Sequence, residues 1–426
     1  MVEFLKRAPW HVPSARREVR ETVSRMLLDI ERDGEAAVRR FSRELDAWDP
    51  PTFVLEPADL RRGADGLDVA LVGHIDFAAT QIRRFARAQR DTLLDLEVET
   101  MPGTVLGHRH IPVGSVGSYV PGGRYPMLAS GLMTVAVAKV AGVSRVIAAA
   151  PPRDGRGPDP GMLQALLTAE ADVVVCLGGV QALAAMAYGL CGLEPVDMLV
   201  GAGNAYVAEA KRQLFGEVGI DLLAGPTEVL VIADDTADPE RVAADLLGQA
   251  EHGPTSPAML VTTSRSLGEA ALRCVERLLD SWPTAEIAGA AWRDHGSILI
   301  AGDDEEAARV TDEHAPEHLE VQVAADKLDW FLDRLRNYGS LFLGAEATVA
   351  YGDKAVGTNH VLPTRGAARF TGGLWVGKFL KTCTYQRLTP EGTRAVAPAV
   401  AAISRAEGFE GHAITADMRL AAADRS

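Results

Sequence analysis

From about residue 104 onward, short runs of β-branched and apolar residues alternate with helical stretches, and this alternation restricts the fold more than any other feature. The predicted strands lie at 145–152, 173–178, 197–203, 228–235, 258–263, 297–302, 319–324 and 340–344. Strands that alternate with helices form largely parallel sheets covered on both faces. We therefore predict an α/β fold with two Rossmann-like parallel-sheet domains, whose ligands bind beyond the carboxyl ends of the strands.

Different patterns flank this region. Residues 15–46 and about 68–98 carry apolar side chains at helical spacing, and the tail from about 371 carries a further helix. We predict four segments: N-terminal helices at 1–104, α/β domains at 105–227 and 228–370, and a C-terminal helical tail at 371–426.

The charge balance excludes two classes of partner. The chain has 426 residues and a formal net charge of −15. Nucleic acid and anionic lipid both attract clustered Lys and Arg. We therefore expect that the chain binds neither nucleic acid nor a membrane surface.

Cysteine usage and hydropathy indicate a cytoplasmic protein. None of the four cysteines belongs to a C-x-x-C pair, and no disulfide framework is indicated. The N-terminus MVEFLKRAPW lacks the apolar stretch of a signal peptide. Residues 173–193 are uncharged and nearly long enough to span a bilayer, but Gly178 and Gly179 divide them into a strand and an Ala-rich helix.

The segment DLLGQAEHGP places Gln249 and His252 three residues apart, on one face of a predicted helix that ends at Gly253. Together they could bind a ligand. A histidine at a helix C-terminus is also favoured by the helix dipole alone, so this pair leaves a purely structural role open.

The segment HAPEH, at 314–318, superficially resembles a zinc-binding H-E-x-x-H helix. Pro316 would interrupt that helix, so we predict a loop that enters a strand and presents Glu317 and His318 side by side. An adjacent carboxylate and imidazole can divide proton transfers between them. The alternative is a solvated surface loop.

Two later segments carry further candidates. In YGDKAVGTNHVLPT, at 351–364, Gly, Asn and Pro predict a loop that contains Asp353 and His360. Both side-chain types ligate zinc, although Asp353 could instead bond its own turn. Glu407 and His412, in AEGFEGHAITAD, are weaker candidates because tail histidines commonly have no function.

Three glycine-rich junctions lie in the first predicted α/β domain: SYVPGGRYP (118–126), LGGVQ (177–181) and GAGNAYV (201–207). Backbone N–H groups at such junctions can hold a phosphate. They permit several phosphate ligands, but we find neither a Walker lysine nor a carboxylate cluster for Mg²⁺, which argues against a phosphoryl-transfer enzyme.

In series, these segments resemble the histidinol dehydrogenase family. The matching stretches are VGSYVPGG, LGGVQALAAMAYG, GNAYVAEAKRQ, AGPTEVLVIAD, DLLGQAEHGP, PEHLE, GTNHVLPT and EGFEGH. The resemblance implies a zinc-dependent, NAD-linked oxidation of a primary alcohol through an aldehyde to a carboxylate. The domain at 105–227 would bind NAD, and the domain at 228–370 would carry the metal and catalytic residues.

The resemblance also assigns roles to single residues. Glu317 and His318 match the catalytic pair. The zinc ligands match Gln249, His252, Asp353 and His412, and the NAD contacts match Tyr119, Gln181 and Asn204. The substrate-binding positions are Thr227, Gln249, His252, His318, Asp353, His360, Glu407 and His412. The family's tail reaches into the neighbouring subunit, which implies a homodimer with shared active sites.

Some residues depart from the biosynthetic histidinol enzymes. Arg124 follows the P-G-G turn where they usually carry a small residue, Thr227 replaces Ser, and Ala202 replaces Pro. An arginine suits a sulfonate or carboxylate oxyanion. The pattern is similar to the sulfopropanediol dehydrogenase branch, and we favour a small anionic diol such as 2,3-dihydroxypropane-1-sulfonate, oxidised to sulfolactate. The alternatives are oxidation of L-histidinol to L-histidine and a catalytically inactive, zinc-stabilised scaffold.

Overall fold

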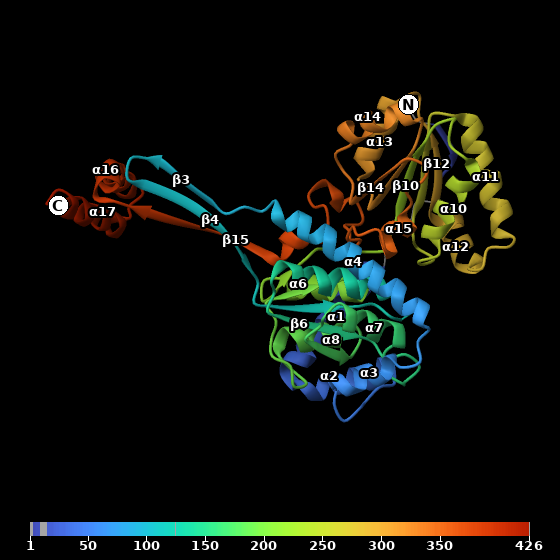
Figure 1. Ribbon diagram of the computed structural model, residues 1–426, viewed down its shortest axis with the longest axis horizontal. Coiled ribbons are helices and arrows are strands. Elements are labelled where there is room, and N and C mark those ends of the chain that lie inside the picture. Colours follow the sequence, from blue (N-terminus) through green and yellow to red (C-terminus); the bar gives the residue numbers. More distant parts are fainter. Residues whose placement is uncertain (1–2, 9–14, 124, 426) are drawn as a thin grey trace.

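The computed structural model describes residues 3–8, 15–123 and 125–425. Within these residues the strands form two six-stranded sheets and one three-stranded sheet. The two larger sheets build two layered bodies that lie beside each other, and the small sheet projects from them as a long arm (Figure 1). The predicted α/β class with two parallel-sheet domains and a helical C-terminal tail is confirmed.

The first sheet has the strand order β2-β7-β6-β5-β8-β9. Its strands are β2 (Val54–Leu55), β5 (Ser115–Tyr119), β6 (Arg145–Ala150), β7 (Val173–Cys176), β8 (Met198–Val200) and β9 (Gly219–Ile220). All neighbours pair in parallel except β2, which is antiparallel to β7. The strand order reverses between β5 and β8, and such a reversal opens a ligand-binding crevice at the carboxyl ends of the strands.

Helices cover both faces of this sheet because alternate strand residues point to opposite sides. Ile147 and Ala149 pack with one set of helices, and Val146 and Ala148 pack with the other. The first set is α1 (Ala15–Asp33), α2 (Glu35–Asp46), α8 (Gly179–Tyr188) and α9 (Ala205–Leu214). The second set is α3 (Pro57–Ala64), α4 (Val69–Asp91), α5 (Leu128–Gly131), η1 (Leu132–Ala136), α6 (Val137–Ala141) and α7 (Pro160–Thr168).

The second sheet has the order β1-β12-β11-β10-β13-β14. It consists of β1 (Glu3–Lys6), β10 (Val229–Ala233), β11 (Ala258–Thr262), β12 (Gly296–Ile300), β13 (His318–Gln322) and β14 (Ser340–Leu343). Only β1 is antiparallel to its neighbour. One face packs on α10 (Pro239–Ala250), α11 (Arg265–Leu279) and α12 (Ala285–His295), and the other on α13 (Asp304–His314) and α14 (Leu328–Arg334).

The arm combines two distant parts of the chain. Strand β4 (Thr104–Pro112) pairs antiparallel with β3 (Leu96–Met101) on one side and β15 (Leu380–Leu388) on the other. Helices α16 (Pro390–Ala406) and α17 (Glu410–Ala423) pack together at its tip (Figure 1). The remaining short elements are η2 (Ala325–Lys327), α15 (Val349–Lys354), η3 (Ala367–Arg369) and η4 (Val376–Phe379).

The structure refines one sequence prediction and confirms another. The helix predicted over about 68–98 ends at Asp91, and its last residues belong to β3. The uncharged run at 173–193 is divided at Gly178 into β7 and α8, as predicted. None of the described helices is long and apolar enough to cross a bilayer.

Candidate active site

The candidate catalytic residues lie at the amino-terminal edge of the second sheet. His318 begins β13 and Glu317 directly precedes it, while Thr227 lies two residues before the start of β10. Helix α10 runs back against the strands, so its C-terminal end brings Gln249 and His252 to the same edge. The expectation that the important residues follow strands is therefore wrong for this sheet, because the returning helix places its end beside the strand starts.

Glu317 is held in a buried pocket. Its Oε2 accepts a hydrogen bond from the Thr227 hydroxyl at 2.6 Å and another from the Glu228 backbone N–H at 2.9 Å. Only 5% of its surface is exposed, which contradicts the alternative of a solvated loop. Burial raises the pKa of Glu317 to about 7. A carboxyl group that titrates near neutral pH is suited to accept and return a proton.

His318 points one ring nitrogen at the backbone and the other into the site. Nδ1 lies 2.9 Å from the carbonyl oxygen of Glu228 and 3.3 Å from the amide nitrogen of Gln249. Nε2 is buried, has no hydrogen-bond partner among the described residues, and lies 3.7 Å from Asp353 Oδ1. Burial lowers the pKa of His318, but the facing carboxylates of Glu317 and Asp353 outweigh it and raise the pKa to about 9.

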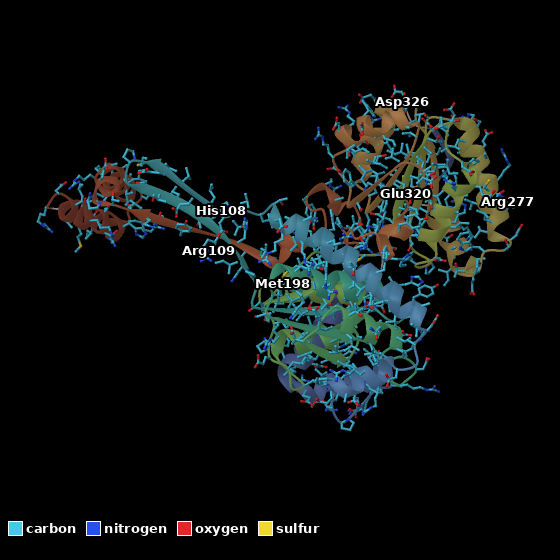
Figure 2. The ribbon with its side chains drawn as sticks, in the orientation of Figure 1. His108, Arg109, Met198, Arg277, Glu320 and Asp326 are labelled. Carbon is cyan, nitrogen blue, oxygen red and sulfur yellow. The ribbon has the colours of Figure 1, made fainter. Side chains whose placement is uncertain are left out.

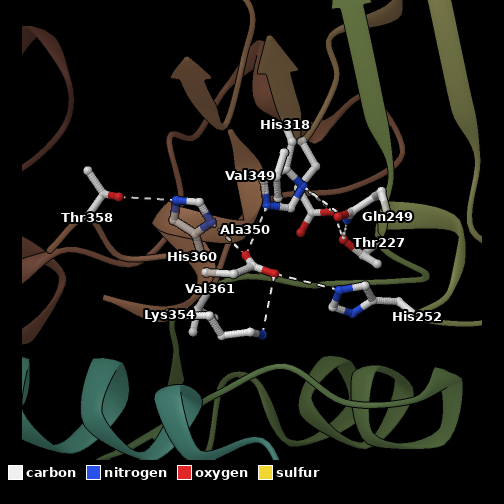
Figure 3. A network of polar contacts seen from close by, with 12 residues as sticks. Thr227, Gln249, His252, His318, Val349, Ala350, Lys354, Thr358, His360 and Val361 are labelled. Atoms are coloured by element: carbon white, nitrogen blue, oxygen red, sulfur yellow. Dashed lines mark hydrogen bonds and ion pairs between the residues drawn. The ribbon is translucent and has the colours of Figure 1, made fainter. Parts of the chain in front are cut away.

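Asp353 faces three imidazoles, those of His252, His318 and His360. Figure 3 shows these three rings turned toward one another. Its Oδ1 is 2.7 Å from Nδ1 of His360, and its Oδ2 is 3.6 Å from Nε2 of His252. Burial alone would raise the pKa of Asp353, but the hydrogen bond from His360 and the nearby imidazoles of His318 and His360 hold the pKa well below its usual value. The predicted loop is wrong here, because Asp353 belongs to the short helix α15, which Thr348 caps.

This cluster can hold a metal ion. Ligand atoms of His318, Asp353 and His360 all lie within 4.8 Å of one another, and the His252 ring adjoins them. Nitrogen and carboxylate oxygen donors of this kind suit zinc. The buried Nε2 of His318 has no hydrogen-bond partner among the described residues, so it can interact with a group bound beside Asp353.

The predicted metal ligands are only partly brought together. Gln249 and His252 adjoin Asp353 and His318, with the Gln249 amide donating to the Thr227 hydroxyl. His412 lies on α17 at the tip of the arm, away from this site in the same chain (Figure 1). Glu407, at the end of α16, is exposed beside it.

The predicted NAD-contacting residues gather at the carboxyl edge of the first sheet. Tyr119 ends β5, and its hydroxyl accepts a hydrogen bond from the Gly179 N–H at 3.3 Å. Gln181 donates through Nε2 to Asp46 at 2.9 Å, while its buried Oε1 has no partner among the described residues. Asn204 caps α9 by accepting from two backbone N–H groups. This edge fits a dinucleotide, since it combines a strand-order reversal, helix N-termini and an unsatisfied polar atom.

A buried ion pair fixes the turn that leads to Asn204. Lys211 and Asp221 are almost fully buried and bond to each other. Lys211 Nζ donates to the Gly201 carbonyl, and Asp221 Oδ2 accepts from the Gly201 N–H, both at 2.8 Å. Leaving either charge unpaired in the core would be costly, so this pair holds the turn in one geometry.

Arg124, the predicted oxyanion contact, lies outside the described residues.

Two residues that the sequence did not single out contact the candidate site residues. Glu228 is buried. Its backbone N–H donates to Glu317, and its backbone carbonyl oxygen contacts Nδ1 of His318. Asp46 reaches Gln181 from the end of α2. Adjacency to Thr227 in the A-G-P-T-E segment could have indicated Glu228, but no local signal marks Asp46.

Comparison with known proteins agrees with this site. The sequence profile described as histidinol dehydrogenase matches residues 12–420. The chain belongs to the histidinol dehydrogenase family. It is 54% identical to a "Histidinol dehydrogenase homolog" of Shouchella clausii, with 95% of this chain and 94% of that protein covered. It is 48% identical to the sulfopropanediol 3-dehydrogenase of Ruegeria pomeroyi, with 99% of this chain and 96% of that protein covered.

More distant members are the biosynthetic enzymes. The histidinol dehydrogenase of Rhizobium meliloti is 40% identical, with 96% of this chain and 94% of that protein covered. The crystal structure of histidinol dehydrogenase from Elizabethkingia anophelis superposes on this structure with a TM-score of 0.91 at 30% sequence identity. The match covers 98% of this chain and 95% of that protein. The family assignment made from the motifs is thus confirmed, and with it a dehydrogenase of this fold.

Proposed function

We propose that this protein is a zinc-dependent, NAD-linked dehydrogenase that oxidises a primary alcohol through an aldehyde to a carboxylate. The observation that carries the proposal is the convergence of Glu317, His318 and Asp353 in one buried site. Gln249, His252 and Asp353 would hold the zinc, together with His412 of a second copy. When bound, zinc would polarise the alcohol oxygen and NAD would accept the hydride.

His318 and Glu317 would move the protons. His318 would take the alcohol proton at Nε2, which faces the site without a partner. The charge of a bound divalent cation would lower the pKa of His318 from about 9 and prepare it for this role. As water adds to the aldehyde, Glu317 would take a proton from the water and protonated His318 would return its proton to the aldehyde oxygen. His318, neutral again, would then accept the hydroxyl proton of the resulting hydrate in the second oxidation.

A hydrate route agrees with the state of two of the four cysteines. Burial raises the pKa of both Cys176 and Cys191, in the latter case to about 12. These thiols therefore stay protonated and are poor nucleophiles. Glu317, with its pKa near neutral, is the better group to activate water at the aldehyde stage.

A homodimer with shared active sites would place His412 at a metal. The arm of one chain carries exposed apolar side chains, among them Ile403, Phe409 and Met418. Tyr351 and Val356, which flank Asp353 in the sequence, are also exposed. Exposed apolar surfaces of this kind mark interfaces. We infer that the arm of a second copy covers this region and brings its His412 and Glu407 to the site.

Removal of the metal is expected to abolish NADH formation. Dialysis against a chelator should leave protein that does not reduce NAD with any primary alcohol, because the proposed mechanism relies on zinc to polarise the alcohol oxygen. Addition of zinc should restore the rate. Spectrophotometric NADH assays together with metal analysis would check this, and full activity of metal-free protein would contradict the zinc requirement.

For the substrate we favour a small anionic diol such as 2,3-dihydroxypropane-1-sulfonate, with L-histidinol as the alternative. The higher identity to the sulfopropanediol enzyme than to the histidinol enzyme supports this order. We expect kcat/KM to be higher for the sulfonate in an assay with NAD. Arg124→Ala should lower it about tenfold or more on the sulfonate, since a charged hydrogen bond is lost, and spare histidinol. Unchanged activity on the sulfonate would contradict the oxyanion contact.

A further inference from the structure

Asp46 is a carboxylate that the proposed reaction does not use. It ends α2 and lies against the turn between β7 and α8. Its Oδ2 accepts a hydrogen bond from Gln181 Nε2 at 2.9 Å, while Oδ1 has no hydrogen-bond partner among the described residues. The carboxylate is so close to the backbone that a Cβ at Gly178 would lie 3.3 Å from it.

The surroundings of Asp46 form part of the carboxyl edge of the first sheet. Gly179 opens α8 with a positive φ of 60°, and its N–H points to the Tyr119 hydroxyl. Gln181 is only 1% exposed, and its Oε1 is buried without a partner among the described residues. Two acceptors, Asp46 Oδ1 and Gln181 Oε1, therefore lie beside the β7–α8 turn, at the same carboxyl edge of the sheet as the reversal of strand order that favours dinucleotide binding.

The chemistry of these acceptors restricts what can bind them. A ligand group that satisfies them must donate hydrogen bonds, and it must tolerate a negative charge. A ribose diol offers two O–H donors and no charge. A phosphate offers acceptors only at neutral pH and is repelled by the carboxylate.

We propose that Asp46, with Gln181, binds the hydroxyl groups of the adenosine ribose and makes this protein select NAD over NADP. This inference rests on the proposed NAD-linked function. A 2′-phosphate would bring a second negative group against Asp46 and would remove one of the two hydroxyl donors. The position of Asp46 corresponds chemically to the acidic residue that hydrogen-bonds ribose in other dinucleotide folds, although α2 supplies it rather than a strand end of the sheet.

Calorimetric titration of the full-length protein with NAD and with NADP would test the assignment. Asp46→Asn should weaken NAD binding about tenfold and reduce the preference for NAD over NADP, because a charge-assisted hydrogen bond is lost. Asn is isosteric and can still accept from Gln181, so the turn should keep its geometry. Asp46→Ser should bind NADP more tightly than the wild type does, a gain that misfolding could not produce.

Asp49→Asn provides the matched control. Asp49 lies three residues further on, is exposed, and pairs with Arg39 and Arg43. Its substitution removes the same charge but should leave both affinities unchanged. If Asp46→Asn and Asp46→Ser keep the wild-type preference, the carboxylate only supports Gln181 and the assignment is overturned while the NAD-linked function stands. If the wild type binds neither dinucleotide, the proposed function itself fails, and this inference fails with it.

Discussion

Glu317→Gln is expected to keep the first hydride transfer and to lose formation of the acid. The carboxamide can still accept from the Thr227 hydroxyl and the Glu228 N–H, so the pocket should keep its shape. It cannot take a proton from water, and loss of general base catalysis typically costs about 10²–10⁴-fold in rate. Stopped-flow detection of NADH and chromatographic analysis of aldehyde and acid would separate the two steps.

Glu313→Gln is the control for this experiment. Glu313 lies on α13 just before the catalytic loop, is exposed, and pairs with Arg309 at 2.6 Å. Its substitution should change neither step. An equal loss of both oxidations in Glu317→Gln would show that Glu317 does not act at the aldehyde stage alone. Wild-type protein that binds zinc but oxidises neither alcohol would instead support the inactive scaffold.

The geometry around Glu317 shows what the sequence could predict. Pro316 prevents a continuous helix, and α13 accordingly ends at His314 before β13 begins at His318. The alternating pattern also located most strands of the two parallel sheets within a few residues, but it missed β5, an inner strand of the first sheet, and the short strands β1, β2 and β9. These features were predictable because they depend on local sequence: a missing N–H at proline and the periodicity of apolar side chains.

Features that depend on distant contacts were not predictable in the same way. Asp46 and Gln181 are 135 residues apart, and only the packing of α2 on α8 brings them together. The strand β15 has mostly exposed side chains and gains its structure from pairing with β4. The general expectation of ligands beyond the carboxyl ends of strands fails for the second sheet, because Glu317 and His318 precede β13 and α10 returns antiparallel to the strands, which brings Gln249 to their amino-terminal edge.

Sharing of the active site between two copies predicts that two inactive variants should restore each other. His412→Ala should lose zinc and activity because its tail cannot complete the partner's site, whereas His318→Asn should keep the tail but lose the catalytic imidazole. In a mixed dimer, the body of the first chain and the tail of the second would form one intact site. Random pairing of equal amounts gives about half mixed dimers and about a quarter of the wild-type activity.

Co-expression of the two variants with different affinity tags would isolate the mixed dimer, and its NADH formation and zinc content would be measured. The far position of His412 on α17 in a single chain is the reason to expect complementation. A mixed dimer without activity would mean that the arm does not reach a neighbouring site. Zinc would then have to be held within one chain, where His360 lies beside Asp353 and is the nearest substitute ligand.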